Sequence, residues 1–146
     1  STRPWSITSS ARPSRSSGHF AVCFVKSCAK PANCAGAAEF LDFLVRGLGG
    51  VETLRHMDGS RIANAQVGVG TCTVMVSEAS KAFPAMPASY YLYVENADEA
   101  MRRALSAGAH QIMPIADMPY GDRQGGIKDP KGNLWWVAQR LVEGPY

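Results

Sequence analysis

The sequence predicts an α+β fold made of two βαβββ modules, whose curved mixed sheets surround a cleft and whose helices cover the outer face. Two observations support this prediction. The same order of strand-like and helix-like patterns occurs twice along the chain, and a short segment with two prolines, FPAMPA, separates the copies. The first module spans residues 19–82, the linker 83–88 and the second module 89–146. Neither half-sheet could bury both of its faces alone, so the modules are expected to share one domain over residues 19–146.

The elements of the first module follow from hydrophobic periodicity and turn residues. A short apolar run at 19–25 is typical of a strand. Residues 35–48 place their large apolar side chains on one helical stripe, and Gly49 ends the helix. Asp58-Gly59 is a strong hairpin signal between the first two strands that follow. These strands and the next are predicted at 51–56, 61–69 and 71–77.

The second module repeats this order. Residues 89–94 (SYYLYV) have the aromatic and β-branched content of a strand. Asn96 and, three residues later, Glu99 form a capping-box pattern, which predicts the start of a helix over 97–107. Three further strands are predicted at 110–115, 125–128 and 133–140.

Composition and charge favour an ordinary globular protein. The chain has 146 residues, 46% of them hydrophobic and 18% charged, which fits one domain. No apolar run reaches the length of a membrane span. The net charge is +3, but five basic residues and no acidic ones precede Glu39, so 10 basic and 12 acidic residues make up the charge from Glu39 onward. We therefore expect no nucleic-acid partner and no membrane partner.

The cysteines and the N-terminal residues bear on location. None of the four cysteines lies in a CxxC pair, so a zinc or redox site is not indicated, and a reducing, cytoplasmic compartment is predicted. Residues 1–18 are rich in Ser, Arg and Pro without hydrophobic periodicity. They are either a targeting peptide or a disordered or incidental extension. The extension is favoured because Pro4 and Pro13 oppose an amphipathic helix.

Three motifs in the second module indicate a family. They are VENADEA followed by AGA, the loop YGDRQGG, and the ending DPKGNLWW. As a set, they resemble the vicinal oxygen chelate superfamily of glyoxalases, bleomycin-resistance proteins and dioxygenases. The chain is most similar to the branch of small bacterial proteins named after a phosphonate-utilisation gene cluster. The first module matches more loosely, and residues 1–33 match nothing that we can place.

The resemblance also gives an expectation about metal. Metal-using members take one ligand from each of four strands, usually His, Gln or Glu. The corresponding positions here hold Met75, Ser89 and Trp136, with His19 at the fourth. The resembling branch often has His and Glu near the start of the third strand, where this chain has Asn64 and Gln66. Neutral amides do not replace an anionic ligand set, so no metal and no cofactor are expected.

Strand alternation predicts which side chains enter the cleft. If Ser89 points inward, so do Tyr91 and Tyr93, and the same reasoning turns Trp136 inward and Trp135 towards the helices. Arg123 could hold a carboxylate, or it could pair with Asp122 and shape the turn. The predicted ligand-binding residues are Asn64, Gln66, Met75, Ser89, Tyr91, Tyr93, Tyr120, Arg123 and Trp136. Taken singly, each aromatic side chain is better explained by core packing, and no catalytic residue can be named.

Their convergence on one face favours a flat, partly apolar ligand over a phosphate or a small keto acid. The first hypothesis is therefore metal-independent binding of a small, partly aromatic molecule, for example to sequester an antibiotic. The alternative is an enzyme of the same superfamily: a glyoxalase, a dioxygenase or a thiol transferase. A dimer without a ligand is a third possibility. The resemblance implies a homodimer, formed by pairing complete barrels or by exchanging modules between chains.

Overall fold

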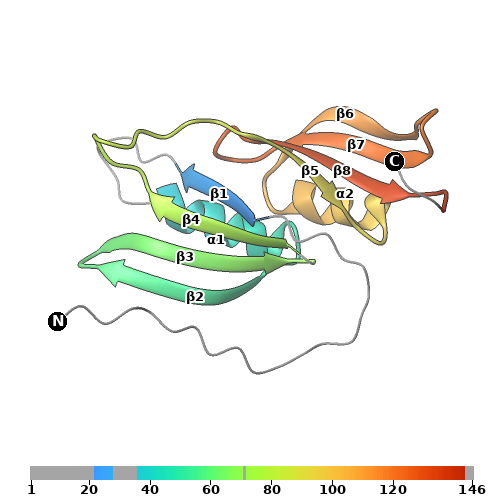
Figure 1. Ribbon diagram of the computed structural model, residues 1–146. Coiled ribbons are helices and arrows are strands. Elements are labelled where there is room, and N and C mark those ends of the chain that lie inside the picture. The colour runs from blue at the N-terminus through green and yellow to red at the C-terminus, as the bar shows by residue number, and fades with distance from the viewer. Residues whose placement is uncertain (1–21, 28–35, 71, 144–146) are drawn as a thin grey trace, which may run out of the picture.

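The computed structural model describes residues 22–27, 36–70 and 72–143, with side chains from residue 36 onward (Figure 1). The first module contains β1 (Val22–Ser27), α1 (Gly36–Arg46), β2 (Val51–Asp58), β3 (Arg61–Val69) and β4 (Cys72–Glu78). The second contains β5 (Ser89–Tyr93), α2 (Ala97–Ser106), β6 (His110–Asp117), β7 (Asp122–Lys128) and β8 (Leu134–Arg140). The predicted α+β fold with two βαβββ modules is thus confirmed. The N-terminal extension and His19 lie outside the described residues.

Each module forms one mixed four-stranded sheet. The strand order is β1-β4-β3-β2 in the first sheet, called sheet A, and β5-β8-β7-β6 in the second, called sheet B. In both sheets the first strand pairs in parallel with the last strand of its module, and the remaining pairs are antiparallel. The two modules therefore share one topology, as their repeated sequence pattern predicts.

The main difference from the predicted elements is β7. It begins at Asp122 rather than at 125, because Asp122 and Arg123 pair with Arg140 and Gln139 of β8. Part of the YGDR motif, interpreted as a loop, is therefore strand. This shift matters for the site, because it fixes which face of sheet B each residue of the motif occupies.

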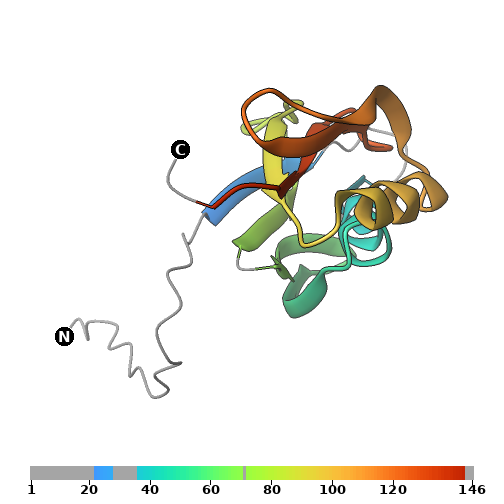
Figure 2. The same cartoon turned by 90° about the vertical axis from the view of Figure 1, so that its right-hand side faces the viewer.

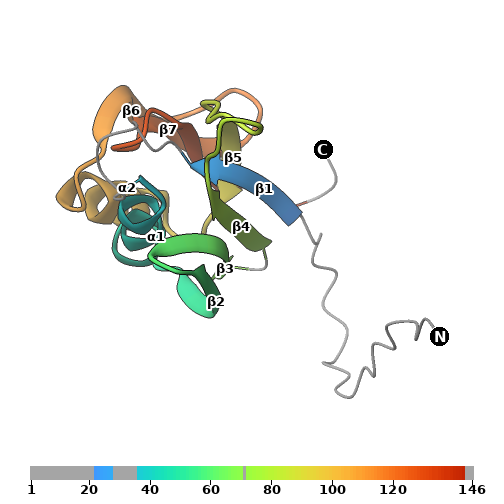
Figure 3. The same cartoon turned by 90° about the vertical axis from the view of Figure 1, so that its left-hand side faces the viewer.

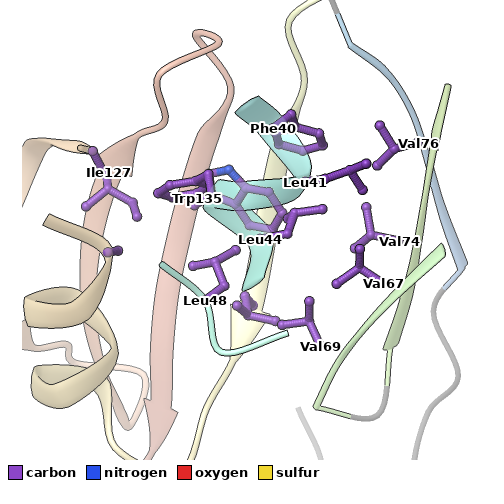
Figure 4. Packing of buried hydrophobic residues seen from close by; sticks show 14 of the residues in the cluster. Phe40, Leu41, Leu44, Leu48, Val67, Val69, Val74, Val76, Ile127 and Trp135 are labelled. Atoms are coloured by element: carbon purple, nitrogen blue, oxygen red, sulfur yellow. The ribbon is translucent and has the colours of Figure 1, made fainter. Parts of the chain in front are cut away.

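The hydrophobic core is continuous across both modules. The buried face of α1 presents Phe40, Leu41 and Leu44, and these side chains pack between β8 on one side and β3 and β4 on the other (Figure 4). Trp135 of β8 is 2% exposed, and its ring centroid lies 6.4 Å from that of Phe40. Burial of such large side chains is the dominant favourable term in folding, so this shared cluster holds the modules together.

Polar contacts reinforce the same arrangement. The two helices lie side by side, as Figures 2 and 3 show from opposite sides. The Arg103 guanidinium of α2 donates to the Gly47 carbonyl just after α1, with 3.4 Å between nitrogen and oxygen. Lys131, in the turn before β8, forms an ion pair with Glu39 of α1. The first module is thus anchored to the second at both ends of α1.

This packing turns the second face of each sheet away from the core. Val74 and Val76 of β4 and Trp135 and Val137 of β8 are buried in the shared cluster. Because side chains alternate along a strand, Met75 and Trp136 project from the opposite faces of their sheets. Because α1 packs between β8 of sheet B and β3 and β4 of sheet A (Figure 4), the outer faces of the two sheets point away from it in different directions within one chain. Of the helices in the described residues, none has the length and hydropathy needed to cross a membrane.

Candidate functional site

The outer face of sheet B carries a cluster of partly exposed aromatic side chains, which we call the aromatic face. It consists of Tyr91, Tyr93, Tyr120 and Trp136, together with Ser89, which is hydrogen-bonded to Trp136. The three tyrosines are 46%, 42% and 55% exposed in chain order. The Tyr91 and Tyr93 rings lie 5.1 Å apart between centroids and are tilted by 50°. Five of the nine predicted ligand-binding residues are therefore brought together by the structure.

Trp136 is held on this face by two features of its neighbours. Its indole nitrogen donates to Ser89 Oγ on the adjacent strand, at 3.2 Å. Its ring lies close to Gly126, its cross-strand partner on β7. A Cβ atom at Gly126 would come within 2.8 Å of the ring, so only glycine leaves the indole its present place. The last glycine of the YGDRQGG motif thus shapes the aromatic face.

Asp122 is the buried polar centre beneath the face. It is 1% exposed, and its Oδ2 accepts hydrogen bonds from the Tyr91 and Tyr93 hydroxyls, both at 2.9 Å. Its Oδ1 accepts from the Arg140 guanidinium at 3.0 Å. Burial by itself raises the pKa of this carboxyl, but the hydrogen bonds from Arg140, Tyr93 and Tyr91 outweigh it and lower the pKa below its usual value. Asp122 therefore remains ionised at neutral pH.

Gln124 extends this network. It is 6% exposed, and its Oε1 accepts from the Tyr91 hydroxyl at 2.7 Å and from the Tyr120 hydroxyl. Tyr91 has a single hydroxyl proton, so it serves Asp122 or Gln124 but not both at once. Burial and then the bond to Asp122 raise the pKa of Tyr91. The phenol therefore stays protonated across the neutral range.

The sequence interpretation missed Asp122, Gln124 and Arg140 as members of this network. The available signal was alternation, which places residues 122, 124 and 126 of an extended β7 on the same face as Trp136. Because β7 was predicted to begin at 125, that signal was lost.

Arg123 lies on the other face of β7 and does not join the cluster. Its guanidinium donates to Asp98 of α2 at 2.6 and 2.9 Å and to Asp117 of β6 at 2.7 Å. The hydrogen bonds that Arg123 donates to Asp98 and then to Asp117 raise the pKa of Arg123 above its usual value. The sequence left open a pairing with Asp122, but the partners are two other carboxylates. Arg123 thus ties α2 to the edge of sheet B.

The remaining predicted residues lie on the outer face of sheet A. Asn64, Gln66 and Met75 are half-buried there, and Gln66 stands opposite Met75 in the β3–β4 pairing. The Asn64 side-chain oxygen is buried and has no hydrogen-bond partner among the described residues. No hydrogen bond or ring contact within the described part of the chain joins this trio to the aromatic face. One chain therefore presents the predicted lining as two separate surfaces.

A cavity of about 640 Å³ lies elsewhere, in the groove between the modules at the start of α2. Its lining combines apolar side chains such as Leu48 and Val69 with charged groups of both signs. The charged residues are Glu95, Glu99, Arg103 and Arg140. Of the predicted site residues only Tyr93 reaches it, at the edge of the aromatic face. We regard the aromatic face as the candidate site because it gathers most of the predicted residues.

At the predicted ligand positions that the structure describes, the side chains do not fit a divalent metal ion. Ser89 Oγ already accepts from the Trp136 indole, whose nitrogen is a donor only. Met75 offers a soft thioether and lies on the other sheet. Among the described residues, no group of three or more His, Cys, Asp or Glu could hold an ion.

Comparisons with known proteins agree with the fold. Residues 18–137 match the family model described as the Glyoxalase/Bleomycin resistance protein/Dioxygenase superfamily. An uncharacterized protein of Mycobacterium bovis is 29% identical over 120 residues, which are 73% of this chain and 78% of that protein. An uncharacterized protein of Mycobacterium tuberculosis strain H37Rv is also 29% identical, over 73% of this chain and 70% of its own length.

Solved structures show the same relationship. TioX from Micromonospora sp. ML1 aligns with a TM-score of 0.69 at 27% identity, over 85% of this chain and all of that one. TnmS3 from Streptomyces sp. CB03234, described as an antibiotic binding protein, aligns with a TM-score of 0.59 at 18% identity. That alignment covers 82% of this chain and 95% of TnmS3. Because the family model spans most of the chain and both modules, this protein belongs to the glyoxalase, bleomycin-resistance and dioxygenase superfamily.

Proposed function

We propose that this protein binds a small, partly aromatic organic molecule on the aromatic face, without a metal ion or cofactor. The observation that carries the proposal is a group of exposed aromatic rings fixed from below by a buried polar network. Exposed apolar patches on folded proteins mark interaction sites, and tyrosine and tryptophan provide large contact area with few rotatable bonds. A face built this way is preorganised for a flat ligand.

One possible role is sequestration of an antibiotic. TnmS3 has the same fold and is described as an antibiotic binding protein. At 18% identity, its fold alone is shared, so the ligand of this chain is a matter for experiment. The assignment to the branch named after a phosphonate-utilisation gene cluster and the cytoplasmic location likewise stay predictions.

The enzymatic alternative is less well supported. The buried carboxylate of the aromatic face, Asp122, is engaged by Arg140 and two phenol hydroxyls. A general acid or base must instead reach the proton that it transfers. We therefore favour binding over catalysis.

Ligand binding can be tested by titrating the protein with a panel of aromatic antibiotics and metabolites while following tryptophan fluorescence and the melting temperature. Trp136→Ala should weaken binding of any hit at least tenfold. Tyr90→Phe is the matched control, because Tyr90 stacks on Trp135 at 4.3 Å, on the face of β5 that Tyr91 does not occupy. If Glu95→Ala in the inter-module groove weakens binding and Trp136→Ala does not, the ligand occupies the groove and the proposed site is wrong.

We further propose that a homodimer completes the cleft, with the outer face of sheet A in one copy covering the aromatic face of the other. The two surfaces point apart within one chain, so only a second copy can bring them together. The segment that connects the modules also presents two large apolar side chains, Phe83 and Met86, at 61% and 72% exposure. Such residues are typical of a surface that a partner covers.

Complementation tests this assembly. Gln66→Arg should block sheet A, and Trp136→Ala should disable sheet B, so each variant alone should lose binding. If the cleft forms between chains, co-expressing the two variants should restore binding in one of the two clefts of each mixed dimer. Light scattering should give twice the mass of one chain. A monomer at micromolar concentration, or no restoration in a verified mixed dimer, would rule out the shared cleft.

A further inference from the structure

The hydroxyl protons of the three exposed tyrosines are all used inside the protein. Tyr93 donates to Asp122 at 2.9 Å, Tyr91 to Asp122 or Gln124, and Tyr120 to Gln124. A phenol that has donated its proton can only accept a further hydrogen bond. The three tyrosines therefore meet a ligand with oxygen lone pairs and the electron-rich faces of their rings.

The charged side chains near the aromatic face do not add a cation that would offset its hydrogen-bond acceptors. Asp122 and Arg140 form an ion pair in which the carboxylate is 1% exposed. Lys128 also lies on this side of sheet B, in the row of Leu134 and Ser89 next to the row of Trp136, but its side chain lies beside Gly132 in the turn before β8. It stands six residues from Asp122 along β7, roughly 20 Å at the usual rise per residue. Arg123 is on the other face and is paired with two carboxylates. Near the tyrosines, no unpaired cation among the described residues is available to hold a ligand anion.

We propose that the aromatic face selects planar aromatic cations, or aromatic ligands with hydrogen-bond donors at the ring edge, and rejects aromatic anions. Positive charge over a tyrosine or tryptophan ring is attracted by the ring quadrupole, and donors at the ring edge pair with phenol oxygens. At the three tyrosines, an anion meets only acceptors and π-faces. This inference rests on the proposed function and specifies the ligand class for the same site.

Two probes with one ring system separate charge from shape. Proflavine is a planar acridine cation at neutral pH, and an acridine carboxylic acid is an anion on the same ring. Fluorescence polarisation of each dye with the whole protein should give at least about tenfold tighter binding of the cation. Trp136→Ala should weaken the binding of proflavine, which places it on the aromatic face.

The role of the network is tested with Asp122→Asn and Tyr91→Phe. In Asp122→Asn the amide can donate to a phenol oxygen, so a hydroxyl proton is released towards the ligand and the preference for the cation should fall at least threefold. Asp117→Asn is the control, because it removes the same formal charge from the same sheet without touching the aromatic face. This variant should prefer the cationic dye over the anionic dye as strongly as the natural protein does. Tyr91→Phe serves if Asp122→Asn does not fold. It removes one acceptor and should also lower the preference.

The outcomes are distinguishable. Equal or tighter binding of the anion, with Trp136 still required, would overturn the charge selection and leave the proposed function standing. A cation preference that Asp117→Asn lowers as much as Asp122→Asn would also overturn it, because net charge would then be the cause. Binding of neither dye would contradict this inference alone, because the proposed function is tested separately with the panel of antibiotics and metabolites.

Discussion

At the scale of single residues, Asp122 organises the aromatic face, and its ionisation links the face to stability. Its pKa is lowered in the folded protein because Arg140 and two tyrosines hydrogen-bond the charged form, against the cost of burial. Because the pKa is lower in the folded protein, the ionised Asp122 stabilises the fold fully at pH values above its pKa in the unfolded chain, about 3.9. This stabilisation is lost as the pH falls through the pKa of Asp122 in the folded protein. Acidification should therefore remove the stabilisation that the ionised Asp122 gives to the folded aromatic face.

Asp122→Asn should accordingly flatten the acid limb of the stability curve. Chemical denaturation of both proteins at several pH values between about 5 and 2 gives the free energy of unfolding at each. The natural protein should lose more stability on acidification than the variant, because the exposed carboxylates contribute equally to both. Parallel curves would mean that Asp122 titrates alike in the folded and unfolded chains.

Gly126 offers a second test at this scale. In Gly126→Ala the new methyl group would lie 2.8 Å from the Trp136 ring and 3.0 Å from Ile112, so the indole must move. We expect a loss of about 1–3 kcal/mol in stability and weaker ligand binding. The matched control is Gly68→Ala in β3, where the nearest atom is a carbonyl oxygen at 3.8 Å. Equal effects of the two substitutions on binding would show that the indole position is not set by Gly126.

At the scale of elements, sequence periodicity predicted both helices and the order of the strands, because alternation and capping are local signals. The Asn96 side chain accepts from the Glu99 backbone nitrogen at 3.0 Å, as the capping pattern indicates. The start of β7 was missed because Gly121 and Asp122 are typical turn residues. Its extra residues are strand because Asp122 finds its partners across the sheet, which local signals do not reveal.

Alternation along β8 separates the two adjacent tryptophans. Trp135 is 2% exposed, stacks on Tyr90 and donates to Asp129 at 2.9 Å, so Trp135→Ala should cost about 3–5 kcal/mol. Trp136 is half-buried on the outer face, so Trp136→Ala should cost less stability and lose more ligand affinity. Urea denaturation and fluorescence titration of both variants measure the two effects. A larger stability loss for Trp136→Ala would reverse the assignment of the two faces.

At the scale of the whole molecule, the sequence could not show how the modules sit against each other. Repetition predicts two similar units, but their orientation depends on contacts such as Phe40 with Trp135, which are far apart in the chain. These contacts make one core, so the modules should unfold together. In Phe40→Ala we expect one cooperative thermal transition at lower temperature, with a loss of about 3–5 kcal/mol. Two separate transitions by calorimetry would show that the modules are energetically independent.

The absence of a catalytic metal is also a prediction about the whole molecule, because its ligands would have to come from several strands of both sheets. Oxygen and nitrogen ligands from separate strands are needed to hold a divalent ion tightly. Trp136 has no lone pair to offer, Ser89 offers one neutral hydroxyl that already accepts from the indole, and Met75 is a soft thioether. His19 lies outside the described residues. Purified protein should contain no stoichiometric Ni, Zn, Fe, Mn or Co, and chelators should leave its melting temperature unchanged. One metal ion per chain by elemental analysis, lost in Gln66→Ala or His19→Ala, would contradict the metal-independent binding proposed for this protein and favour an enzyme of the same superfamily.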